Sequence, residues 1–169
     1  MGYSAKEIAN FFLERYSKYG ITPLKLQKLI YIAHGWCLGL YDIPLVWDEY
    51  AEAWEYGPVF PSIYHEFKEF GRGPISRMAT EIKMNENYEL VEKTPKIKKQ
   101  DKETRRLLER IWEIHGDHSG LFLSSLTHEK NSPWYETVKS KNGTLKKNEH
   151  IPNEVILKYY KEKLNDKSR

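Results

Sequence analysis

The stretch that decides the fold is LQKLIYIAHGW, residues 26–36. Its apolar positions recur with the 3.6-residue period of an α-helix, and the pattern continues past the quoted stretch. The predicted buried stripe consists of Leu26, Leu29, Ile30, Ala33, Cys37 and Leu40. Thr22 supplies a helix cap, and Pro23 suits the first helical position. We therefore predict a central core helix from about Pro23 to about Leu40.

A second block, EAWEYGPV at residues 52–59, must contain a turn. Pro58 has no N–H, and the residue before a proline is pushed out of the α region. Further blocks follow in order: PSIYHEF at 61–67, LL at 107–108, IW at 111–112, HG at 115–116, LTH at 126–128 and PW at 133–134. Together they resemble the Panacea domain, the SocA-like antitoxin family of bacterial and phage toxin–antitoxin pairs. The resemblance covers most of the chain, and its first two blocks are the most specific.

This resemblance implies a function that the residue chemistry alone does not indicate. Antitoxins of this family are thought to neutralise a toxin encoded beside them by direct protein contact. The implied partner is a cognate toxin protein. Two alternatives stay open: a proteolytic adaptor that delivers a toxin to a protease, and a nucleic-acid-binding regulator, whose affinity for its target falls steeply with salt.

Length and composition predict a single domain over residues 1–169. The helical patterns along the chain predict that this domain is mainly α-helical and built around the apolar core helix. It has one small β element, for which residues 50–56 and 88–91 are the candidate segments. Hydrophobic residues make up 40% of the chain and charged residues 30%, with a mean hydropathy of −0.72. No apolar run approaches the roughly 18 residues of a membrane span and no export signal is visible, so we expect a cytoplasmic protein without membrane contact. One cysteine excludes an internal disulfide.

Capping patterns predict further helices around the core helix. Ser4 and Glu7 form a capping box at the start of the first helix, and Gly20 is well placed to end it. Later helices are expected to begin at Asp101, Ser119 and Ser132, and a C-terminal helix is expected near residues 152–164.

Two glycines, Gly35 and Gly39, lie four residues apart on the predicted core helix. Each costs up to about 1 kcal/mol of helix propensity. A pair on one side of a helix therefore predicts that another backbone approaches closely there.

Charge is distributed unevenly along the chain, although the net charge is only +3. Residues 1–91 hold nine basic and twelve acidic residues, whereas residues 92–169 hold eighteen and twelve. Such runs usually form solvated faces, but they also suit contact with a charged partner, where complementary charge speeds encounter. Aromatic residues are frequent interface anchors and equally frequent core residues. The candidate partner-binding residues are Trp47, Trp54, Tyr56, Phe60, Lys98 and Lys99.

Residue groupings that could support chemistry are weak. The HGDH segment at residues 115–118 offers metal-ligand types, but its glycine should break the helix and no fixed-spacing motif is present. Cys37 lies three residues after His34, yet it belongs to the predicted buried stripe, where burial raises the pKa of a thiol. The stretch 29–40 is too apolar and glycine-rich for a recognition helix, so nucleic-acid binding is disfavoured. We predict no enzymatic activity and no catalytic, cofactor-binding or metal-binding residues.

Overall fold

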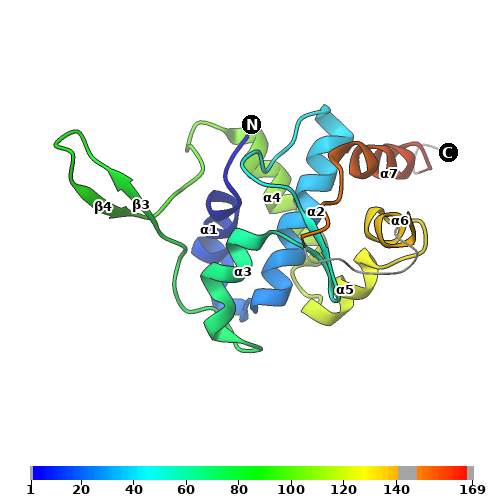
Figure 1. The fold of residues 1–169 in the computed structure, drawn as a ribbon, viewed down its shortest axis with the longest axis horizontal. Helices are drawn as coiled ribbons and strands as arrows, with labels where there is room; N and C mark the ends of the chain where they lie inside the picture. Colours follow the sequence, from blue (N-terminus) through cyan, green and yellow to red (C-terminus); the bar gives the residue numbers. More distant parts are fainter. Residues whose placement is uncertain (1, 141–147, 167–169) are drawn as a thin grey trace.

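The computed structural model describes residues 2–140 and 148–166, and it is mainly α-helical (Figure 1). Its described residues form α1 (Ala5–Tyr16), α2 (Pro23–Tyr41), α3 (Pro61–Phe67), α4 (Lys102–His115), α5 (Gly120–Thr127), α6 (Pro133–Ser140) and α7 (Asn153–Asp166). Short 3-10 turns extend two helices: Ser17–Tyr19 follows α1, and Lys68–Phe70 follows α3. The predicted mainly helical fold is confirmed.

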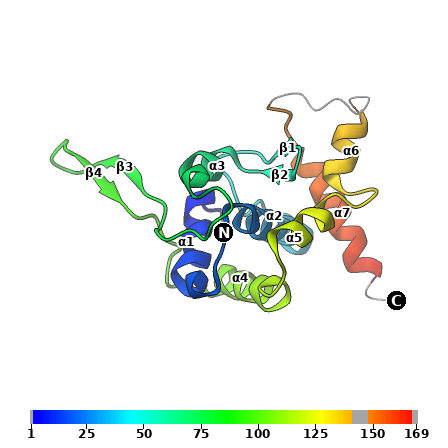
Figure 2. The same cartoon turned by 90° about the horizontal axis from the view of Figure 1, so that it is seen from below.

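Helix α2 runs through the middle of the fold and contacts α1, α3, α4, α5 and α7 (Figures 1 and 2). The predicted stripe from Leu26 to Cys37 is fully buried, as expected. Burial extends further, because neighbours pack around the helix and bury 14 of its 19 residues. Leu40 departs from the prediction. It is 46% exposed because it borders an open groove between α2 and α4.

Local capping signals act as predicted. The Ser4 Oγ accepts the Glu7 N–H at 3.2 Å, and the Glu7 carboxylate accepts the Ser4 N–H at 2.8 Å. Side chains of Thr22, Asp101, Ser119 and Ser132 each accept an N–H from the residue three positions later. These bonds satisfy N–H groups that a helix start leaves without an internal partner.

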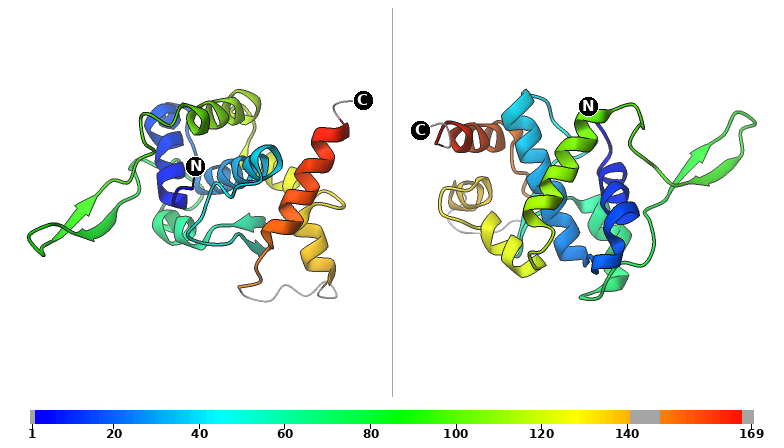
Figure 3. Two further views of the ribbon diagram at one scale, coloured as in Figure 1. Left: turned by 90° about the horizontal axis from the view of Figure 1, so that it is seen from above. Right: turned by 180° about the vertical axis from the view of Figure 1, so that it is seen from behind.

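Helix α7 crosses α2 at the two glycines. A Cβ on Gly35 would lie 2.1 Å from Cε2 of Tyr160, and a Cβ on Gly39 would lie 2.8 Å from Cβ of Tyr160. Figure 3 shows the two helices packed against each other from above. The close approach predicted from the glycine spacing is confirmed, and the helix that makes it is the expected C-terminal one.

His34 ties two distant segments to the core helix. Its Nδ1 accepts the Val46 N–H at 3.1 Å, so its Nε2 carries the proton and donates to Oδ1 of Asn153 at 3.0 Å. Burial of the ring lowers the pKa of His34 to about 4. The neutral imidazole thereby joins the segment before β1 and the first residue of α7 to α2.

Two antiparallel hairpins are present where one small β element was predicted. Strands β1 (Glu52–Trp54) and β2 (Gly57–Val59) form the first, and β3 (Glu81–Met84) and β4 (Leu90–Lys93) form the second. The first hairpin packs against α2, α5 and α6. The second projects away from the helices in every view (Figures 1 to 3). Both candidate segments of the sequence therefore contribute a strand.

Candidate partner-binding site

Side chains from three helices hold the turn between β1 and β2. Within residues 54–60, four backbone carbonyls accept a hydrogen bond from a side chain elsewhere in the chain, and a fifth lies close to a histidine ring nitrogen. The four bonds run from Trp134 Nε1 to Trp54 O (2.8 Å), from Ser124 Oγ to Tyr56 O (2.8 Å), from Lys28 Nζ to Pro58 O (2.9 Å) and from Gln27 Nε2 to Phe60 O (3.0 Å). His128 Nε2 lies 3.1 Å from Glu55 O, and its Nδ1 lies 2.6 Å from Ser124 O. Carbonyls in a turn usually bond to water. Here the protein supplies the donors, and this fixes the path of the turn.

Gln27 holds the last residue of the 54–60 segment, Phe60, through two hydrogen bonds. Its Nε2 donates to the Phe60 carbonyl, and its Oε1 accepts the Phe60 N–H at 2.9 Å. The buried amide therefore satisfies both backbone groups of one residue, as a neighbouring strand would. This pairing joins the residue that directly follows the second sequence block to the core helix.

Lys28 is a fully buried amine beside the turn. Removal from water lowers the pKa of Lys28 to about 7. Its Nζ donates to Pro58 O, and a Cβ on Gly57 would lie only 2.9 Å from that Nζ. The amine is 0% exposed, so a substrate in solution cannot reach it, and its role here is to hold the turn.

Tyr56 is the aromatic side chain that the turn presents to solvent, with 60% of its surface exposed. It lines a surface depression together with residues at the start of α2, in the turn after α3 and at the start of α5. The lining residues are Thr22, Leu24, Tyr56, Gly71, Arg72, Ser119, Gly120 and Leu121. Leu121 is 70% exposed. We call Tyr56, Leu24, Arg72 and Leu121 the Tyr56 surface. Tyrosine and arginine are enriched among the residues that dominate binding energy at protein interfaces.

The predicted aromatic anchors divide by burial. Tyr56 and Trp47 are exposed, Trp47 by 68%. Trp54 is half-buried, and its Nε1 donates to the Glu52 carboxylate at 2.8 Å. The prediction of Phe60 as a contact residue is wrong, because its side chain is 0% exposed and belongs to the core.

Lys98 and Lys99 are exposed but lie away from the Tyr56 surface. They come directly before α4, whereas α5 follows the other end of that helix (Figure 3). A 14-residue helix spans about 20 Å. The structure therefore does not bring the two lysines together with the Tyr56 surface.

Residues missed at the sequence level lie on α5. Leu121, Phe122 and Leu123 are consecutive, and only Leu123 is buried, while Phe122 is 49% exposed. Three successive apolar residues on a helix cannot all face the same core, because each residue turns by about 100°. This pattern was the available signal for an exposed apolar patch.

The described residues offer little for catalysis. Burial raises the pKa of the Cys37 thiol to about 12, and both ring nitrogens of His34 are engaged elsewhere. No group of three or more His, Cys, Asp or Glu in the described part of the chain could hold a metal ion. His115 and His118 have ring centroids 5.7 Å apart. Among the helices at residues 2–140 and 148–166, none is long and apolar enough to cross a membrane.

Known proteins match the part of the chain that contains the turn between β1 and β2. The family described as Antitoxin SocA-like, Panacea domain, matches residues 26–135. Antitoxin SocA of Caulobacter vibrioides (strain NA1000 / CB15N) is 30% identical over 132 residues, which cover 77% of this chain and 68% of that protein. No solved structure matches the chain significantly. The family match spans the held turn and every side chain that bonds to its carbonyls.

Proposed function

The chain belongs to the SocA-like Panacea antitoxin family, and on this basis we propose that it neutralises a protein toxin by direct contact through the Tyr56 surface. One observation carries the choice of surface. Tyr56 is exposed on a turn whose backbone carbonyls are bonded to side chains of α2, α5 and α6. A surface that is ordered before binding avoids part of the entropic cost of association.

The energetic demand on such a surface is high. Silencing an enzyme at cellular concentrations calls for nanomolar affinity, about −12 kcal/mol. A few anchors that each contribute about 2 kcal/mol or more typically supply most of that energy. Tyr56 and Leu121 offer large exposed side chains beside a depression, and Arg72 adds a cationic donor at its edge.

Blocking and delivery to a protease are two outcomes of the same contact. A blocking antitoxin leaves the bound toxin intact, whereas an adaptor shortens its lifetime. We favour blocking without catalysis, because the only thiol is buried and the buried lysine is used to hold the turn. Measurement of the toxin's half-life with and without this protein separates the two outcomes.

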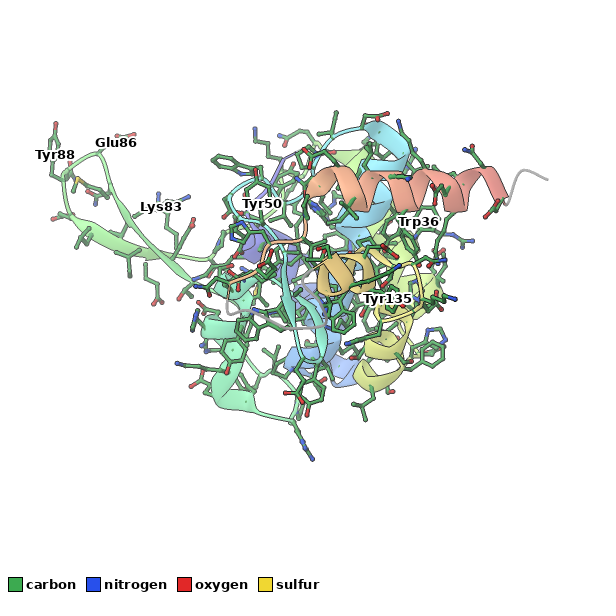
Figure 4. All side chains as sticks on the ribbon, turned by 45° about the vertical axis from the view of Figure 1, so that its right-hand side comes forward. Trp36, Tyr50, Lys83, Glu86, Tyr88 and Tyr135 are labelled. Atoms are coloured by element: carbon green, nitrogen blue, oxygen red, sulfur yellow. The ribbon has the colours of Figure 1, made fainter. Side chains whose placement is uncertain are left out.

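The test uses the product of the neighbouring gene as the toxin. Cells expressing that gene should grow when this protein is co-expressed, and the two proteins should co-purify. Tyr56→Ala should raise the dissociation constant about 30-fold or more, equivalent to about 2 kcal/mol, mainly through faster dissociation. The matched control is Tyr50→Ala. Tyr50 is 53% exposed and precedes β1 (Figure 4). Its ring stacks on that of His150.

Different failures have different meanings. If the neighbour is toxic and the wild-type protein neither rescues growth nor co-purifies, direct neutralisation of that toxin is wrong. If the wild-type protein works and Tyr56→Ala binds as tightly as Tyr50→Ala, the contact lies on another surface. Charge reversal of Lys98 and Lys99 should slow association and leave dissociation nearly unchanged, because distant charges steer encounter.

A further inference from the structure

The hairpin of β3 and β4, here called the arm, displays an apolar face that none of the residues at 2–140 and 148–166 covers. Its register pairs Ile82 with Glu92 and Met84 with Leu90, which places these four residues on one face. Ile82 is 63%, Met84 60% and Leu90 72% exposed. The other face carries charge, including an ion pair between Glu81 and Lys83 at 2.6 Å.

The end of the arm is held in a defined conformation. The Oδ1 of Asn85 accepts the N–H of Asn87 and of Glu89, each at 2.9 Å, and the Asn85 carbonyl accepts the Tyr88 N–H at 3.1 Å. Tyr88 adopts a positive φ of 61° and is 85% exposed at the free end of the arm (Figure 4). The apolar face is therefore carried by an ordered hairpin with an aromatic tip.

An isolated two-stranded ribbon is only marginally stable in water, and contiguous exposed apolar residues usually mark an interaction surface. The net charge of the arm limits which surface can cover its apolar face. Residues 81–93 hold four glutamates and two lysines, a net charge of −2. Two arms packed against each other would place these like charges together, so the arm does not suit another arm.

A surface of complementary character lies between α2 and α4. The open groove there is bordered by the apolar residues Leu40, Tyr41 and Leu107 and by Lys102, Glu103, Arg106 and Arg110. The four charged residues carry a net charge of +2. Leu40, in the last turn of α2, contributes an apolar side chain that is 46% exposed. The arm points away from both helices in each view, so it does not occupy this groove in its own chain (Figures 1 to 3).

We propose that the arm of one copy docks into the α2–α4 groove of a second copy of this chain. Ile82, Met84 and Leu90 cover Leu40 and Tyr41, while Glu86 and Glu92 of the arm face Lys102 and Arg106. Reciprocal exchange of two arms closes the assembly at two copies and leaves neither arm uncovered. This inference concerns the free protein and is independent of the proposed antitoxin function.

Light scattering and sedimentation of the whole chain over a dilution series test the proposal. The wild-type protein should form a dimer that dissociates on dilution. Leu90→Glu should raise the dimer dissociation constant at least about tenfold, equivalent to about 1.4 kcal/mol. The matched control is Val91→Glu, which places the same carboxylate on the opposite face, across from Lys83. Thermal unfolding of both variants checks that the helical body stays folded.

Charge reversal identifies the two surfaces as partners. Glu86→Lys with Glu92→Lys should weaken the dimer, as should Lys102→Glu with Arg106→Glu, and all four changes in one chain should restore it. A monomer at every concentration overturns the proposal. The proposal is also wrong if Leu90→Glu leaves the dimer dissociation constant unchanged, or if Lys102→Glu with Arg106→Glu leaves it unchanged. If the protein is monomeric and Leu90→Glu abolishes toxin binding, the arm serves the toxin and the proposal is again wrong.

Discussion

Gly57→Ala tests whether the packing of the turn between β1 and β2 requires a residue without a side chain. Gly57 has a φ of 98°, a conformation that costs an L-amino acid about 1–2 kcal/mol. An added Cβ would lie 2.8 Å from Thr127 Oγ1, 2.9 Å from Lys28 Nζ and 3.0 Å from His128 Cε1. Overpacking of this kind costs about 1–3 kcal/mol. We therefore expect Gly57→Ala to lower the free energy of unfolding by about 2–5 kcal/mol.

Gly20→Ala separates backbone strain from crowding. Gly20 also has a positive φ, 73°, but no atom lies within 4 Å of an added Cβ. It should therefore lose only the strain term of about 1–2 kcal/mol. Both substitutions restrict the unfolded chain by a similar amount, so this opposing effect cancels in the comparison. Urea unfolding followed by circular dichroism, extrapolated linearly to water, measures both losses.

The expected order is a larger loss for Gly57→Ala than for Gly20→Ala. Equal losses would refute the crowding argument, because the three contacts would then have no energetic effect. The same variant tests the functional site. A folded Gly57→Ala protein must displace the turn that carries Tyr56, so its affinity for the toxin should fall. Wild-type affinity in a measurably destabilised variant would show that presentation of Tyr56 does not depend on this packing.

Other predictions follow from burial. Leu29→Ala should lower the free energy of unfolding by about 2–5 kcal/mol in urea unfolding, and a loss below about 1 kcal/mol would contradict its core position. Because the pKa of His34 is about 4 in the folded state, below its ordinary 6.5, the unfolded chain binds the extra proton first. The contribution of neutral His34 to the free energy of unfolding should therefore be fully present above about pH 6.5 and fall by up to about 3 kcal/mol as the pH drops towards 4, a loss that His34→Gln should lack. For Lys28, with a folded pKa of about 7 against 10.5, stability should rise between pH 7 and 10.5, and Lys28→Met should remove that rise. Cys37→Ser, if folded, should still neutralise the toxin in the growth assay. Loss of neutralisation with retained toxin binding would show that Cys37 has a chemical role.

Helix positions were predictable because their signals are local. The capping box of Ser4 and Glu7 and the cap of Thr22 act within four residues, and the period of the core helix is read from its own sequence. The two glycines of α2 also predicted that another backbone packs closely there. Each glycine lowers helix propensity, and a close contact compensates for that loss. The identity of that contact, Tyr160, lies more than 120 residues away and had no local signal.

Burial of individual aromatic residues was decided by the tertiary structure. Trp54, Tyr56 and Phe60 lie within one short segment, yet they are half-buried, 60% exposed and fully buried. Their composition is equally suited to a core and to an interface, so the sequence left both readings open. The path of the hairpin turned Phe60 inward and Tyr56 outward, and the apolar run on α5 placed Leu121 beside Tyr56.

The family and its helical plan could therefore be read from the sequence alone, whereas the candidate site could not. Blocks such as Gln27-Lys28 and Gly57-Pro58 are recognisable because residue types and spacing are properties of the chain. The bonds that join those blocks span 30 to 80 residues and exist only where the backbone carbonyls of the turn meet side chains from other helices. Such contacts depend on how distant segments pack in space, and a one-dimensional pattern of residues does not contain that geometry.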